Sequence, residues 1–134
     1  MLVQETIQPL LRYFNAAASG ADTSVVSIAN TQAVRIVVHT GTVTGSAALR
    51  VFVNTTNSTS GAVEIADKAI ATLAANSTYE IFVTGEEAYA ALERASHLFV
   101  RVAGTGTAQI AIEVSALPGR DIPASLPTNW TRVL

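Results

Sequence analysis

The sequence contains no cysteine, and lysine occurs only once, at Lys68. Without cysteine the chain has no disulfide bonds, no thiolate nucleophile and no zinc site built on cysteine. A chain of 134 residues is long enough to bury a sufficient hydrophobic core without such staples. We therefore expect one domain that is stabilised by packing.

Charged residues are also scarce, at 13% of the chain compared with about 25% in typical globular proteins. The formal net charge is −2, and no cluster of lysine and arginine is present. This disfavours binding to nucleic acid or to an anionic membrane surface, since both need concentrated positive charge. Thr, Ser, Ala and Gly replace many of the missing charges, and such a neutral surface favours protein partners.

Long apolar runs are missing as well. No segment approaches the ~20 apolar residues that a membrane-spanning helix needs. The first residues, Met1 to Glu5, lack the basic and apolar regions of a signal peptide. We expect a protein that is made in the cytoplasm and stays soluble or assembles there.

The region from Ser24 to Leu117 consists of short apolar segments with the two-residue alternation of β-strands. Gly104–Thr107 is typical of a tight hairpin turn between the last two strands. Gly85–Arg94 predicts one short helix with Glu86 and Glu87 in its first turn, where the helix dipole favours acidic residues. The expected strands are residues 25–28, 33–39, 48–54, 63–73, 78–83, 96–103 and 108–114.

This spacing, without a βαβ rhythm, predicts an all-β fold: an antiparallel, jelly-roll-like β-sandwich with one short helical crossover. Residues 24–117 form the expected sandwich domain, and residues 118–134 form an extended C-terminal arm. Residues 1–23 are an N-terminal arm or linker. Its apolar residues have helical spacing that Pro9 interrupts, so both a short helix and an extended arm stay open.

Residues able to carry catalysis are few and dispersed. His39 and His97 are far apart in the sequence, and the adjacent Glu86 and Glu87 are explained by the start of the helix. No serine lies in a Gly-x-Ser-x-Gly motif. We therefore expect no enzyme, no catalytic residue, no metal and no cofactor. Four Asn-x-Ser/Thr sequons occur, at Asn54, Asn57, Asn76 and Asn129, and are expected by chance in a chain this rich in Ser and Thr.

Two aromatic residues, Phe52 and Phe82, lie on the strand face opposite the main apolar set. The outer face of a sandwich is normally polar, so we expect these rings to be covered. The favoured cover is a protein partner. The alternatives are a segment of the same domain, or a bound sugar.

The tail from Pro118 to Leu134 contains three prolines and the only tryptophan. Fully extended, it spans up to ~55 Å, well beyond the ~14 Å radius of gyration of such a domain. Docking on a partner is the favoured hypothesis, ahead of folding back on the same domain and of disorder. The expected anchors are Ile122, Leu126, Trp130, Val133 and Leu134.

The block from Leu73 to Val83 contains Tyr79-Glu80-Ile81, and after the helix follow Phe99-Val100-Arg101-Val102 and the Gly104–Thr107 segment. Over roughly residues 63–117 this order resembles small virion proteins of tailed bacteriophages, in which a "Tyr-Glu-Ile" strand, a crossover and a "Phe-Val-Arg-Val" strand follow one another. Such proteins resemble capsid decoration, or cement, proteins.

The resemblance implies a structural virion protein, commonly a homotrimer, that clamps the outer capsid surface where capsomers meet. The implied partners are the major capsid protein and further copies of the chain, with no small-molecule substrate. Two other hypotheses stay open. One is a carbohydrate- or receptor-binding module of a phage tail or fibre, and the other is a head–tail or tail-tube protein that forms a ring.

Overall fold

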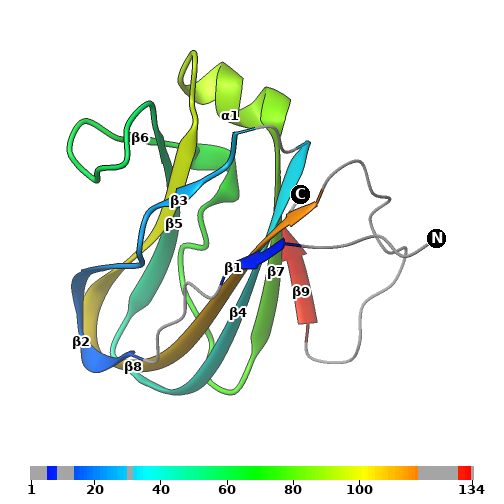
Figure 1. The fold of residues 1–134 in the computed structure, drawn as a ribbon. Helices are drawn as coiled ribbons and strands as arrows, with labels where there is room; N and C mark the ends of the chain where they lie inside the picture. Colours follow the sequence, from blue (N-terminus) through cyan, green and yellow to red (C-terminus); the bar gives the residue numbers. More distant parts are fainter. Residues whose placement is uncertain (1–5, 9–13, 30–31, 118–129, 134) are drawn as a thin grey trace.

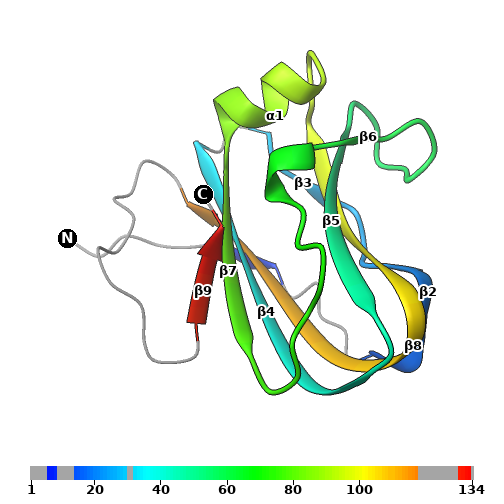
Figure 2. The same ribbon diagram turned by 180° about the vertical axis from the view of Figure 1, so that it is seen from behind.

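The computed structural model describes residues 6–8, 14–29, 32–117 and 130–133, and arranges them as a curled, mainly antiparallel sheet (Figures 1 and 2). This confirms the predicted all-β, sandwich-like fold with a short helix. The long strands are β4 (Ala33–Thr44), β5 (Ala47–Asn54), β7 (Thr78–Thr84) and β8 (His97–Leu117). The shorter elements are β1 (Thr6–Gln8), β2 (Phe14–Asp22), β3 (Val26–Ser27), β6 (Val63–Glu64), β9 (Trp130–Val133), the 3-10 helix η1 (Ala66–Lys68) and α1 (Gly85–Ala91).

Strand β8 connects the whole sheet. Along one side it pairs with β5 through residues 97–104 and with β4 through residues 107–117. Along its other side it pairs in turn with β3, β2 and β1. The two halves of β8 therefore belong to the two packed halves of the fold, which explains the curl seen in Figure 1.

The predicted hairpin at Gly104–Thr107 is wrong, because β8 continues through these residues. Ala47 pairs with Gly104 and Thr44 with Thr107, so the chain bends here without reversing. Gly104 and Gly106 have φ angles of 154° and 84°. A Cβ on Gly106 would lie 2.0 Å from the Thr44 carbonyl oxygen. The glycines thus allow the backbones to approach at a bend in both strands.

Alternation along the strands places one set of side chains in a continuous core. This set is contributed by both halves of the sheet and includes Ile36, Leu49, Ile81, Val100 and Ile112, all with an exposed fraction of zero. The core closes the space between the two halves, as expected of a sandwich.

Helix α1 is the crossover between β7 and β8 and begins with a capping box. The Thr84 hydroxyl accepts a hydrogen bond from Glu87 N, and Glu87 Oε1 accepts one from Thr84 N, each at 3.1 Å. This pairing satisfies two backbone donors at the helix start. The helix ends at Ala91, three residues before the predicted end at Arg94.

The terminal segments supply strands at the margins of the sheet. In the N-terminal 23 residues, predicted as an arm or linker, β1 and β2 pair with β8. At the other end of the chain, β9 pairs with β7 in parallel, with Thr78 opposite Trp130 and Ile81 opposite Val133. Figure 2 shows β9 beside β7 at the edge of the sheet.

Candidate functional site

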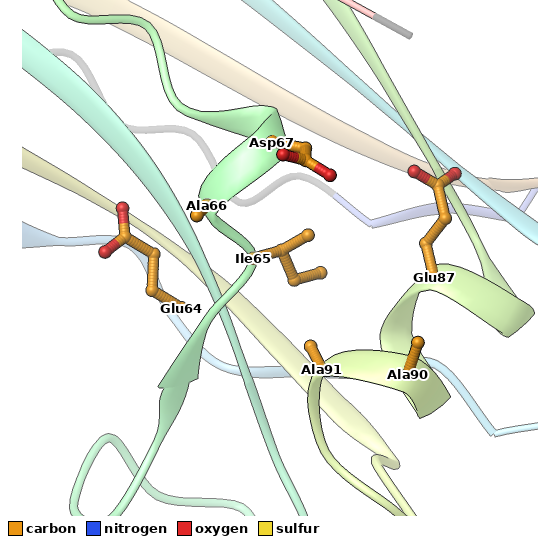
Figure 3. A pocket seen from close by; sticks show the side chains of 7 residues that line it. All are labelled: Glu64, Ile65, Ala66, Asp67, Glu87, Ala90 and Ala91. Atoms are coloured by element: carbon orange, nitrogen blue, oxygen red, sulfur yellow. The ribbon is translucent and has the colours of Figure 1, made fainter.

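A hollow of about 310 Å³ lies between η1 and α1 and is drawn in Figure 3. Asp67 from η1 and Glu87 from α1 face it from two sides, while the Glu64 carboxylate points away. The lining residues are Glu64, Ile65, Ala66, Asp67, Glu87, Ala90 and Ala91.

Lys68 and Glu87 form an ion pair beside this hollow. The Lys68 side chain is 1% exposed, and its Nζ lies 2.5 Å from Glu87 Oε2. Partial burial by itself would raise the pKa of Glu87. The hydrogen bond and charge of Lys68, with the hydrogen bonds to Thr84, outweigh this effect, so that the pKa is lowered. Glu87 is therefore ionised at neutral pH, and its ion pair with Lys68 joins η1 to α1.

Two of the three carboxylates of the hollow have charged or polar partners. Glu64 lies 3.7 Å from Arg50 Nε, and Glu87 is engaged by Lys68 and Thr84. Among the residues that the structure describes, no group of three or more His, Asp or Glu side chains is arranged to hold a metal ion. The Lys68–Glu87 ion pair joins η1 to α1.

The two histidines are not brought together. His39 lies on β4 opposite Ala111 of β8, and its Nδ1 is 3.2 Å from Thr78 Oγ1. His97 begins β8 opposite Asn54, and its Nδ1 is 2.8 Å from Ser96 Oγ. The two histidines therefore lie at different halves of β8, His39 beside the second half and His97 at the start of the first.

Phe52 lies on the outer face of β5 in an aromatic stack. Its ring is parallel to that of Phe99, with centroids 5.2 Å apart. The Arg101 guanidinium lies 4.7 Å from the Phe52 centroid and is held by two hydrogen bonds to Asp22, of 2.7 and 3.0 Å. The hydrogen bond to Asp22 also raises the pKa of Arg101. Because this cation occupies a ring face, Phe52 offers less surface for stacking a sugar.

Phe82 lies on the outer face of β7 and is 2% exposed. Its neighbour in the strand pattern, Glu80, is fully buried and accepts a hydrogen bond of 2.5 Å from Arg35 Nε. Val37 on the adjacent β4 is also buried. Thus the outer face of β4 and β7 is already covered at Phe82 within the single chain, whereas the sequence analysis favoured a protein partner as the cover and gave a segment of the same domain as an alternative.

The predicted arm anchors fall into two groups. Trp130 and Val133 lie in β9, whose backbone pairs with β7 of the same chain. This is the fold-back that the sequence analysis ranked second to docking on a partner. Ile122, Leu126 and Leu134 lie outside the described residues.

Sequence reasoning did not identify the edge of β7 as a receiving surface, nor Arg101 as part of the aromatic stack. Both depend on strand register, which brings Asp22 opposite Arg101 and Trp130 opposite Thr78. The alternation of apolar and polar residues in 78–83 shows which side chains share a face of the strand. It does not indicate which other strands pair with this one.

The sequon asparagine Asn54 has a structural role. It is 4% exposed, and its Nδ2 donates hydrogen bonds to the carbonyl oxygens of Ser58 and Ser60, at 2.7 and 2.9 Å. These bonds hold the turn between β5 and β6.

The described part of the chain contains no helix of the length and apolar character needed to span a bilayer.

No family model matches the chain, and no curated protein matches it in sequence. Among solved structures, a subunit of the Bacillus endospore appendages, which form disulfide-linked pili, is 12% identical with a TM-score of 0.43, covering 89% of this chain and 93% of its own. A chain of the infectious bursal disease virus VP2 subviral particle is 13% identical with a TM-score of 0.37, covering 89% of this chain and 33% of its own. A chain of the Gx strain of that virus is 16% identical with a TM-score of 0.38, covering 89% and 32%. This chain spans about a third of the length of the viral chains. Structural similarity at these TM-scores does not identify the function of this chain.

Proposed function

We propose that this chain is a non-enzymatic structural protein of a virion, and specifically a capsid decoration protein. The observation that carries the proposal is the position of the chain ends. The N-terminal β1 and β2 lie along β8, and the C-terminal β9 lies along β7, so both ends supply marginal strands of the sheet. Marginal strands present backbone donors and acceptors that can pair with neighbouring chains.

The surface chemistry supports the same role. The chain carries little net charge, and the ion pairs Arg35–Glu80, Lys68–Glu87 and Arg101–Asp22 neutralise several of its charged groups. A neutral surface is compatible with close packing in a shell. The proposed partners are the major capsid protein and two further copies of the chain, on the outer surface of the capsid.

The test is reconstitution on capsids from which the protein is absent. We expect the purified chain to bind such shells at a fixed number of copies and to raise their temperature of disruption. Bovine serum albumin at the same concentration is the control for adsorption. Shells that bind no chain, measured by sedimentation and electron microscopy, would contradict the proposal.

The oligomeric state provides a separate test. Light scattering coupled to size exclusion should give about three times the chain mass of 14.0 kDa. A ring of six or more copies would instead favour the head–tail or tail-tube hypothesis.

A further inference from the structure

We propose that residues 63–73 form a strap that closes one edge of β5, and that the Lys68–Glu87 ion pair is its latch. When the latch is broken, the strap opens while the pairing of β4 with β7 and β8 stays intact. The closed strap keeps the edge of β5 from pairing with another chain. This inference goes beyond the proposed function and does not depend on it.

Strand β5 needs a cover on the edge that faces away from β8. Its other edge is paired with β8 along the whole strand. The segment Ala47–Val53 is apolar apart from Arg50 and contains neither proline nor glycine. Segments of this length and composition pair readily with further strands when an edge is left open. Closing the second edge of β5 therefore protects the folded chain from association.

The strap closes this edge with an interrupted set of backbone contacts. Strand β6, at its start, pairs with β5 over only two residues, and η1 then interrupts the pairing between Ile65 and Ile70. Such a segment has fewer backbone bonds per residue than a full ladder, and segments of this kind open at low cost. The further bonds are Ile65 N to Val51 O (2.9 Å), Leu49 N to Ile70 O (2.9 Å), Ile70 N to Leu49 O (2.8 Å) and Leu73 N to Ala47 O (2.8 Å).

Side chains hold the strap at two places. Ile65, Ile70 and Leu73 are buried and belong to the core. The Lys68 side chain, only 1% exposed, ends at the Glu87 carboxylate of α1. The hollow of about 310 Å³ lies between η1 and α1 (Figure 3). Because of this hollow, the ion pair rather than close packing joins the strap to the helix.

A buried ammonium group makes the closed strap depend on its partner. Burial of Lys68 is favourable only while Glu87 supplies the opposite charge, and in the open strap the ammonium group returns to water. Loss of the partner therefore shifts the balance toward the open strap. The ladders that join β4 to β7 and to β8 contain no residue of the strap, so they need not break when it opens.

Hydrogen exchange followed by NMR at increasing, non-denaturing urea tests whether the strap opens separately. The amides of Ile65, Ile70 and Leu73 are compared with those of the central strand β4. We expect the strap amides to exchange at least tenfold faster, at rates that urea changes little, because local opening exposes little surface. Equal rates with the same dependence on urea would show that the strap opens only with the whole domain, and would overturn the proposal.

Glu87→Gln tests the latch, because glutamine keeps an acceptor for Thr84 N but offers no charge to Lys68. We expect the strap amides to exchange at least tenfold faster than in the natural chain, again with little dependence on urea. Glu86→Gln, in the same helical turn and exposed, is the matched control and should change the rates less than twofold. Unchanged strap rates in Glu87→Gln would show that the ion pair is not the latch.

The double variant Lys68→Met with Glu87→Gln separates the charge from the contact. No unpaired ammonium group is then buried, so the exchange rates of the strap should return to within about threefold of the natural rates. Rates as fast as those of Glu87→Gln alone would show that an unpaired charge is not what opens the strap.

Association of the chain is the readout for the exposed edge. At neutral pH and equal concentration, folded Glu87→Gln should grow beyond the mass of the natural chain at least fivefold faster than Glu86→Gln, as measured by light scattering. A Glu87→Gln chain whose strap opens faster, but which keeps the mass of the natural chain, would contradict the protective role of the strap.

Discussion

Three glycines lie where β8 bends alongside the segment that joins β4 to β5. Gly45, Gly104 and Gly106 all have positive φ, and a Cβ at any of them would lie within 2.6 Å of a backbone oxygen of the facing chain segment. Gly61 also has a positive φ, of 78°, but has no atom within 4 Å of an added Cβ. A substitution at Gly61 therefore tests backbone strain alone. A substitution at Gly45, Gly104 or Gly106 adds a steric clash with the facing backbone.

We predict that Gly106→Ala destabilises the protein by about 3 kcal/mol, because left-handed strain and a backbone clash add. Gly61→Ala is the matched control and should cost about 1 kcal/mol, from the conformation alone. Urea unfolding followed by circular dichroism measures both. Equal losses would show that the close approach at the bend does not contribute to stability.

At the scale of elements, the Lys68–Glu87 pair joins η1 to α1. Removing one partner of a buried pair costs about 3–5 kcal/mol, and less when a partner is partly exposed, as the Glu87 side chain is at 35%. Glutamine at position 87 retains the capping box with Thr84, so the substitution isolates the charge.

We therefore predict that Glu87→Gln lowers the free energy of unfolding by about 2 kcal/mol at neutral pH, because it leaves Lys68 buried without its counter-charge. Adding Lys68→Met to Glu87→Gln should recover part of the loss. Glu86→Gln, in the same helical turn but exposed, is the control and should be nearly neutral. A loss in the control equal to that in Glu87→Gln would assign the effect to the helix dipole.

The same pair gives a dependence on pH. The pKa of Glu87 in the folded protein lies below its ordinary value of 4.5, so its ionisation stabilises the fold above that pH. We predict that the difference in stability between the natural chain and Glu87→Gln is constant at pH 6–7. It should shrink as the pH falls below 4.5 and through the folded pKa. Urea titrations at a series of pH values measure this, and a difference that grows toward acid pH would reverse the predicted sign.

For the whole molecule, β8 makes the two halves of the sheet depend on one another. It pairs with β1, β2, β3, β4 and β5, so its loss removes the strand pairing that joins the β5 half of the sheet to the β4 half. Leu98 lies in its first half and Ile112 in its second, and both are fully buried in the same core. We expect cooperative unfolding in one transition.

Accordingly, Leu98→Ala and Ile112→Ala should each lower the free energy of the same single transition by about 2–5 kcal/mol. Tyr89→Ala, at a residue 58% exposed on α1, is the control and should change it by less than about 0.5 kcal/mol. Circular dichroism in urea is the measurement. Two separate transitions in either core variant would show that the halves unfold independently.

The sequence by itself determined which side chains share a face, because alternation in a strand has a period of two and needs no partner to be recognised. It therefore placed Phe52 and Phe82 on the face opposite the main apolar set, and it predicted the start of α1 at Gly85 and an all-β fold. These features depend on neighbours within a few residues. They were accessible without knowing which strands pair.

Only the tertiary structure decided which strands lie side by side and where the chain bends. Gly104 and Gly106 are compatible with a reversal or a bend, and the choice depends on the facing backbone of Thr44 and Ser46, some sixty residues away. Likewise, Lys68 meets Glu87 because the tertiary fold places η1 beside α1, and Trp130 lies opposite Thr78 through strand register. Because strand pairing depends on contacts distant in sequence, local patterns do not specify it.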